Sequence, residues 1–299
     1  MKSERKFRAA IVCALLIASA LLAGELGRNE TDAASHDARG IRIAARHTNA
    51  DAAPPPVPYD AATARVSFVA KQTWEHDTSA FTEGLLIHDG RLIESTGLEG
   101  HSDVREIERT TGVVRRRAVL APSLFGEGVA VVGDRLYQLT WQNGRGYVYD
   151  VATFAPRDSF AFSGEGWGLT NDATRLYMSD GSNRIRVISP DGFRTERTIQ
   201  VTESDRPVWM LNELEWIRGE LWANVYQTDL IARINPLSGE VVGWVDLSQL
   251  LTADERRQAQ KRGGLANGIA FDEKSGRVFV TGKMWPKLFE MDLSAISRP

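Results

Sequence analysis

The sequence predicts an all-β protein, a five-bladed β-propeller with four antiparallel strands in each blade. A turn-and-strand pattern occurs five times, in DGRLIESTG, GDRLYQLTW, ATRLYMSDG, RGELWANVY and SGRVFVTGK. The anchors of these copies lie about 40 to 57 residues apart, and an apolar strand precedes each copy. A repeat of this length accommodates four short strands, which is the content of a propeller blade.

The third and fourth strands of most repeats are predicted from period-2 alternation around Thr-Gly, Asp-Gly and Ser-Gly turns. Helical periodicity is confined to LSQLLTADERRQAQKR, residues 247–262, between the fourth and fifth repeats. The fifth repeat ends after its third strand, KLFEMDLSAI. We expect the N-terminal strand ARVSFVAKQTW to supply the fourth and close the ring. A β-sandwich is the alternative, and five in-phase repeats disfavour it.

Three regions are predicted along the chain. Residues 1–26 contain a basic start and the apolar run AAIVCALLIASALLAG, which indicates a signal peptide or an uncleaved anchor. Residues 27–64 are an Ala- and Pro-rich linker, and residues 65–299 form the propeller domain. We therefore expect export, to a periplasm or to the outside of the cell. The only cysteine, Cys13, lies in the apolar run, so no disulfide is expected in the mature chain.

Polar and aromatic residues are predicted to converge at one end of the ring, where the inner strands of a propeller meet. First strands carry Glu83, Glu127, Trp167, Asn212 and Asn267, and second strands carry Glu94, Trp141, Trp222, Tyr226 and Lys283. Glu127 stands between two glycines. Either the glycines serve a tight turn, or they let a ligand approach the carboxylate. Inner strands could also need glycine only because the channel is narrow.

Seven motifs occur in an order that resembles one family, the plant and bacterial type of glutamine cyclotransferase. They are FTEGLL, ESTGLEGHSDVREIE, FGEGVAVVGDRLYQLTW, GWGLTND, LNELEWIRGELWANVYQTDLIARI, NGIAFD and VTGKMWPKLFE. The resemblance implies a five-bladed propeller that converts N-terminal glutamine of peptides and proteins to pyroglutamate and releases ammonia. It also implies that Glu127 is the catalytic carboxyl, with Lys283 and Asn212 beside it.

The resemblance further implies a substrate pocket formed by Phe81, Glu83, Glu94, Trp141, Trp167 and Tyr226. Two positions depart from the family pattern. Tyr226 replaces a usual tryptophan, and Glu99 replaces a usual tyrosine near the entrance.

The expected mechanism is an intramolecular acyl transfer in which one carboxyl performs both proton transfers. Glu127 then needs a raised pKa, and Trp141 and Trp167 are expected to desolvate it. Either Asn212 or Lys283 could stabilise the developing oxyanion. Either Glu83 or Glu94 could contact the substrate's α-ammonium group.

Two alternatives belong to other function classes. The first is a metal-dependent, lactonase-like propeller hydrolase, and the second is a non-enzymatic propeller that binds peptides. No histidine cluster has the spacing of metal ligands, so no cofactor and no catalytic metal are expected, although a structural calcium in the channel is left open. The net charge of −3 gives no reason to expect nucleic acid. A monomer is expected, with membrane contact only through an uncleaved anchor.

Overall fold

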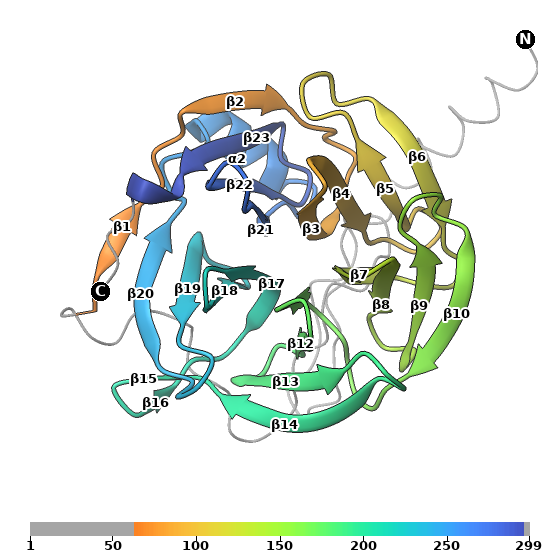
Figure 1. The fold of residues 1–299 in the computed structure, drawn as a ribbon. Helices are drawn as coiled ribbons and strands as arrows, with labels where there is room; N and C mark the ends of the chain where they lie inside the picture. Colours follow the sequence, from red (N-terminus) through yellow and green to blue (C-terminus); the bar gives the residue numbers. More distant parts are fainter. Residues whose placement is uncertain (1–62, 296–299) are drawn as a thin grey trace, which may run out of the picture.

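Five β-sheets surround a central axis in the computed structural model, which describes residues 63–295 (Figure 1). The predicted five-bladed propeller with four antiparallel strands per blade is confirmed. The predicted signal segment and nearly all of the predicted linker lie outside the described residues. None of the helices among residues 63–295 has the length and apolarity needed to cross a membrane.

Each blade begins at the axis and adds its strands outward. Blade 1 contains β3 (Thr82–His88), β4 (Arg91–Thr96), β5 (Asp103–Ile107) and β6 (Val114–Val119). Blade 2 contains β7 (Gly126–Val132), β8 (Arg135–Thr140), β9 (Arg145–Asp150) and β10 (Pro156–Ala161). Blade 3 contains β11 (Leu169–Asn171), β12 (Leu176–Ser179), β13 (Arg184–Ser189) and β14 (Arg194–Gln200).

The last two blades each include a strand from the start of the described chain. Blade 4 contains β17 (Leu211–Ile217), β18 (Glu220–Val225), β19 (Leu230–Ile234), β20 (Val241–Asp246) and the added β1 (Arg65–Ser67). Blade 5 contains β21 (Ala266–Asp272), β22 (Arg277–Gly282), β23 (Lys287–Asp292) and β2 (Gln72–Glu75). A small hairpin of β15 (Thr202–Glu203) and β16 (Arg206–Pro207) precedes blade 4, and a 3-10 turn, η1 (Leu293–Ala295), follows β23.

The N-terminal segment closes the ring as predicted, but it contributes to two blades. Only β2 is the missing outer strand of blade 5, where it pairs antiparallel with β23. Upstream, β1 pairs parallel with β20 and covers the outer edge of blade 4. Between them Phe68 donates its backbone N–H to the Asp246 carbonyl and is buried in the apolar layer between blades 4 and 5. One short segment therefore pairs with both blade 4 and blade 5 and connects them.

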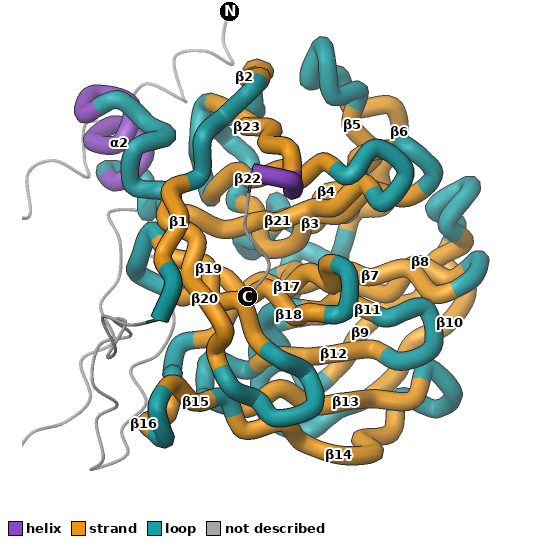
Figure 2. Tube along the Cα trace, turned by 60° about the vertical axis from the view of Figure 1, so that its left-hand side comes forward, coloured by secondary structure: helices purple, strands orange, loops and turns teal. Residues whose placement is uncertain are grey.

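The predicted helical insertion is also present, although it is shorter than the periodic stretch. Helix α2 (Ala253–Gln260) lies outside the sheets (Figure 2). It begins at a capping box. The Thr252 hydroxyl accepts from the Glu255 backbone N–H, and the Glu255 carboxylate accepts from the Thr252 backbone N–H. Leu247 and Leu251, which precede the cap, are buried between blades 4 and 5. The apolar half of the predicted stretch is thus an anchor, and only its polar half is helix.

Buried apolar side chains form a separate layer at each of the five contacts between neighbouring blades. Alternation along the strands produces these layers, because successive side chains point to opposite faces of a sheet. A sixth cluster has a different composition. It is mainly aromatic and gathers residues from loops at one end of the ring.

Two buried glutamates of β17 join inner strands of different blades. Glu213 accepts from the backbone N–H groups of Leu85 and Ile269, at 3.2 and 2.9 Å. Glu215 accepts from the N–H of Phe271 at 2.8 Å and from Thr170 Oγ1 at 3.1 Å. Burial raises the pKa of Glu215 to about 8, and burial together with Glu215 raises the pKa of Glu213 well above its usual range.

Truncation tests the two roles of the N-terminal segment. A chain that starts at residue 63 should fold. A chain that starts at Ala70 loses β1 and the buried Phe68, which removes about 3 kcal/mol or more and should lower the melting temperature by roughly 10 °C. A chain that starts at Asp77 also loses β2 and exposes the edge of β23, so it should aggregate. Equal melting temperatures for all three chains would contradict these roles.

The pH dependence of stability tests the Glu215 environment. Its folded-state pKa of about 8 exceeds the ordinary value of 4.5, so the folded state binds more protons between these values. The favourable contribution is complete below about pH 4.5 and is lost as pH rises through about 8. Glu215→Gln removes this titration, so its melting temperature should fall less than that of the parent protein between pH 5 and pH 8. Identical slopes would show that Glu215 does not titrate in this range.

Candidate active site

The inner strands of four blades carry a β-bulge at the same end of the ring. The pairing register shifts between Thr82 and Gly84, Gly126 and Val129, Leu211 and Leu214, and Ala266 and Ile269. The residues inside these bulges include Glu83, Glu127, Asn212 and Asn267. In blade 3 the strand starts late, and Trp167 lies just before it. Since bulges redirect side chains, they bring the predicted inner-strand residues to one end.

The glycines beside Glu127 are required by close contact between blades. A Cβ atom on Gly128 would lie 2.4 Å from the backbone nitrogen of Leu169, and one on Gly126 would lie 2.6 Å from the Thr96 carbonyl oxygen. Gly128 donates its N–H to the Trp167 carbonyl at 2.7 Å. Neither glycine is among those with a positive φ. Backbone crowding therefore explains both glycines, and neither a tight turn nor ligand approach is needed.

Three ionisable side chains form the centre of the site. Lys283 donates to both carboxylate oxygens of Glu83, at 2.5 and 2.6 Å, and Asn267 donates to Glu83 at 3.2 Å. Glu83 also shares a side-chain hydrogen bond with Glu127. All four side chains are buried.

The charges of this centre favour one protonated carboxyl. Burial and the neighbouring Glu83 raise the pKa of Glu127 well above its usual range. Burial also raises the pKa of Glu83, but Lys283 opposes that rise. Burial alone would lower the pKa of Lys283, whereas the carboxyls of Glu83 and Glu127 raise it. Glu127 therefore holds the proton of the carboxyl pair, while Glu83 and Lys283 form an ion pair.

An aromatic shell covers this centre. It contains Phe81, Phe125, Trp141, Trp167 and Tyr226, together with Leu98 and Met284. The five rings are 5–9% exposed, so access to the centre is narrow. Lys283 Nζ lies 4.7 Å from the Phe81 ring centroid and 5.7 Å from that of Tyr226. The ring of Tyr226, the substituted position, packs edge-on against Trp167 at 5.6 Å.

Glu165 is a site residue that the sequence analysis missed. One of its carboxylate oxygens accepts from Trp141 Nε1 at 2.9 Å and from Trp167 Nε1 at 2.8 Å, and the other accepts from Gln142 at 2.9 Å. Its charge also contributes to the raised pKa of Glu127. The available signal was a second Gly-Glu-Gly, at 164–166, which repeats the pattern around Glu127.

Asn212 is the remaining predicted residue at this end. It is buried, and its Oδ1 atom has no hydrogen-bond partner among the described residues. Its backbone carbonyl accepts from Ser179 Oγ at 2.6 Å, which fixes the bulge that carries it. Because oxygen and nitrogen of an amide can exchange places, this side chain can present either an acceptor or a donor to a ligand.

Glu94, one of the two carboxylates expected to contact the substrate's α-ammonium group, has protein partners in the structure. This carboxylate is fully buried and accepts from His76 Nε2 at 2.9 Å and from Thr82 Oγ1 at 2.7 Å. Burial alone would raise the pKa of Glu94, but the contacts with His76 lower it, and Glu94 raises the pKa of His76 in return. The contacts with His76 and Thr82 are both made by Oε1, and Oε2 of Glu94 has no hydrogen-bond partner among the described residues. A contact of Glu94 with the substrate's α-ammonium group stays a prediction. Glu99, the other departure, is exposed in the loop after β4.

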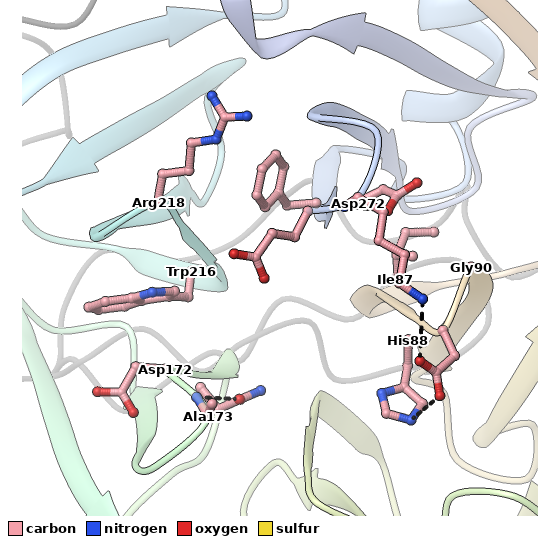
Figure 3. A pocket seen from close by; sticks show the side chains of 13 residues that line it. Ile87, His88, Gly90, Asp172, Ala173, Trp216, Arg218 and Asp272 are labelled. Atoms are coloured by element: carbon pink, nitrogen blue, oxygen red, sulfur yellow. Dashed lines mark hydrogen bonds and ion pairs between the residues drawn. The ribbon is translucent and has the colours of Figure 1, made fainter.

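The opposite end of the ring has a cavity of about 600 Å³ that contains none of the predicted site residues (Figure 3). It is formed by the turns after the inner strands. Figure 3 shows Trp216 and Arg218 on one side and His88 on the other. His88 follows Glu83 by five positions along β3, so the two ends are about 17 Å apart along that strand.

Among residues 63–295, no three His, Cys, Asp or Glu side chains are grouped so that they could hold a metal ion. At the centre of the site, the Lys283 ammonium and the Glu127 proton balance the two carboxylates.

Known proteins resemble this chain in sequence and in fold. The family model described as glutamine cyclotransferase matches residues 42–293. A glutaminyl-peptide cyclotransferase of Arabidopsis thaliana is 39% identical over 224 residues, which cover 74% of this chain and 70% of the plant protein. The crystal structure of Myxococcus xanthus glutaminyl cyclase superposes with a TM-score of 0.71 at 36% identity, over 76% of this chain and 96% of that one.

Proposed function

Because the chain belongs to the glutamine cyclotransferase family and converts N-terminal glutamine of peptides to pyroglutamate, we propose that Glu127 transfers the protons of this reaction as a neutral carboxylic acid. The raised pKa of Glu127, caused by burial and by the adjacent Glu83, carries this proposal. A carboxylic acid has a donor oxygen and an acceptor oxygen on the same group, so it can give and take a proton without moving.

Lys283 acts on this acid through Glu83. Its ammonium group keeps Glu83 ionised, and the negative charge of Glu83 keeps the proton on Glu127. Lys283 is thus a positioning and charge-balancing residue. The oxyanion role that the sequence analysis left open between Lys283 and Asn212 falls to Asn212, because Lys283 already donates to both oxygens of Glu83.

The reaction requires one bond to form and one to break. The neutral α-amine attacks the γ-carboxamide carbon of the same residue, and a five-membered ring closes as the C–N bond forms. The carbonyl oxygen of Glu127 accepts the amine proton, and its hydroxyl gives a proton to the departing nitrogen, which leaves as ammonia. Glu127 ends the cycle protonated again. Asn212 donates to the substrate oxygen as negative charge develops there.

The aromatic shell holds the folded conformer of glutamine and excludes water. Attack within one residue needs the amine close to the γ-carbon, and a tight pocket supplies much of that orientation. Glu165 accepts from both indole N–H groups and therefore fixes the planes of Trp141 and Trp167. This carboxylate is a positioning residue for the pocket walls.

We also propose that the chain is exported and acts as a monomer. The basic start and apolar run of residues 1–26 support export. Among residues 63–295, large exposed apolar side chains are few, which supports a monomer.

Glu127→Gln tests the proton transfers. Glutamine preserves the shape and some hydrogen bonding but cannot exchange a proton, so kcat should fall at least roughly a hundredfold. KM and the melting temperature should change little, since one neutral group replaces another. Glu273→Gln, the same change at an exposed turn of the opposite end, is the matched control. Near-normal turnover of Glu127→Gln, measured as ammonia release from a Gln-initiated peptide, would rule out Glu127 as the shuttle.

Chelation tests metal independence, which we propose because an ammonium group and a proton already balance the site's carboxylates. The purified protein should convert a Gln-initiated peptide at an unchanged rate in excess EDTA. Loss of turnover that added zinc restores would reject the mechanism.

A further inference from the structure

A groove with both polar and apolar walls lies along the contact between blades 1 and 5, next to the site. Its volume is about 640 Å³, and it is lined by the loop Asp77–Ser79, the loop after β4, the outer strand β6, and Arg262 and Met284. Blade 5 is the blade that the N-terminal segment completes, and that segment continues directly into the loop at Asp77. The groove thus lies where the ring closes.

Two side chains connect the groove with the aromatic shell. Leu98 and Met284 both belong to the shell and both line the groove. Each has a positive φ, 85° for Leu98 and 58° for Met284, which non-glycine residues seldom adopt. The Met284 N–H is held by the Ala80 carbonyl at 2.7 Å, and Lys283 precedes it in the chain. Such strained residues gather at functional sites, and here they border the catalytic centre and the groove together.

Arg262 supplies an uncompensated positive charge to the groove. Its guanidinium donates to the backbone carbonyls of Thr78, Met284 and Gln258, at 3.0, 3.2 and 3.3 Å. Among residues 63–295 it has no ion-pair partner. The two acids of the groove, Asp77 and Asp103, are both paired with Arg105. Arg117 lies 3.8 Å from Asp103 and is largely exposed. Three guanidinium groups therefore face two carboxylates.

We propose that this groove binds the peptide chain that follows the N-terminal glutamine, and that Arg262 selects substrates with a carboxylate side chain there. The inference rests on the proposed position of the glutamine beside Glu127, since the groove begins at the shell that encloses that residue. Carbonyl contacts hold the guanidinium in place, so binding a carboxylate requires little further ordering of the side chain. The preference for residues after the N-terminal glutamine then arises at the contact between blades 1 and 5, where the ring closes.

A set of peptides of equal length tests at which position a carboxylate side chain is preferred. Amidated Gln-initiated peptides that carry a single Glu at the second, third or fourth position are compared with the same peptides carrying an internal Gln instead. At low salt, one position should favour Glu by about three- to tenfold in kcat/KM, mainly through KM, and 0.5 M NaCl should reduce the preference. Equal kcat/KM for Glu and Gln peptides at every position would overturn the proposal.

Variants separate recognition from support of the Met284 loop. Arg262→Gln should lower kcat/KM for the Glu peptides more than for the neutral peptides and so abolish the Glu preference. Arg262→Lys should keep part of the preference, and Arg194→Gln, on the outer strand of blade 3, should keep it all. Equal losses on acidic and neutral peptides would show that Arg262 only holds the loop and would overturn the proposal. Calorimetry on the Glu127→Gln variant should show the same preference in Kd, so the groove and the role of Glu127 can fail separately.

Discussion

The structure depends on five hydrogen bonds, one between each pair of neighbouring blades, that use the residues of the inner bulges. In ring order they are Ser95 Oγ to Glu127 O, Gly128 N to Trp167 O, Ser179 Oγ to Asn212 O, Gly268 N to Asn224 Oδ1 and Asn267 Nδ2 to Thr82 O. Inner strands have one edge without a strand partner, and buried backbone groups must still be paired. In four of these bonds the bulged residue uses a backbone group, and in the fifth Asn267 uses its side-chain amide. The hydrogen bonds that join neighbouring blades therefore also fix the positions of the site residues. The site is pre-organised before substrate binds.

Four glutamates are buried on inner strands, and their partners decide what each one does. Glu213 and Glu215 accept from backbone N–H groups of other blades, so their oxygens are occupied by the fold. Glu83 is paired with Lys283, and Glu127 shares a side-chain hydrogen bond with the carboxyl of Glu83. Burial raises the pKa of all four, so a perturbed pKa alone does not mark the catalytic group. The distinguishing feature of Glu127 is the hydrogen bond that its side chain shares with a second carboxyl, that of Glu83.

The repeats made the blades predictable, because each blade is local in sequence and its strand alternation and turns are visible there. Part of the site was predictable because its residues occupy equivalent positions on the first or second strands of different repeats. On this basis Glu83, Glu127, Asn212 and Lys283 were predicted to lie at the same end of the ring. What was missed depends on contacts between distant segments. One partner of Glu94 is His76, which precedes β3 in the sequence, whereas Glu94 follows β3. No local sequence pattern indicates that these two side chains are in contact. Likewise, β1 pairs with a strand about 180 residues away, and its parallel direction has no signature in a three-residue strand.

The segment from β2 to the start of β3 links folding with catalysis. Within residues 72–83 the chain supplies the closing strand, the loop that borders the groove between blades 1 and 5, and then Phe81 and Glu83. Closing the ring pairs residues more than 200 positions apart, and such long-range contacts form late because their loop-closure entropy must be offset first. Glu83 can meet Lys283, and so bias the proton onto Glu127, only when blades 1 and 5 are in contact. The acid that performs the chemistry is therefore assembled by the same event that completes the fold.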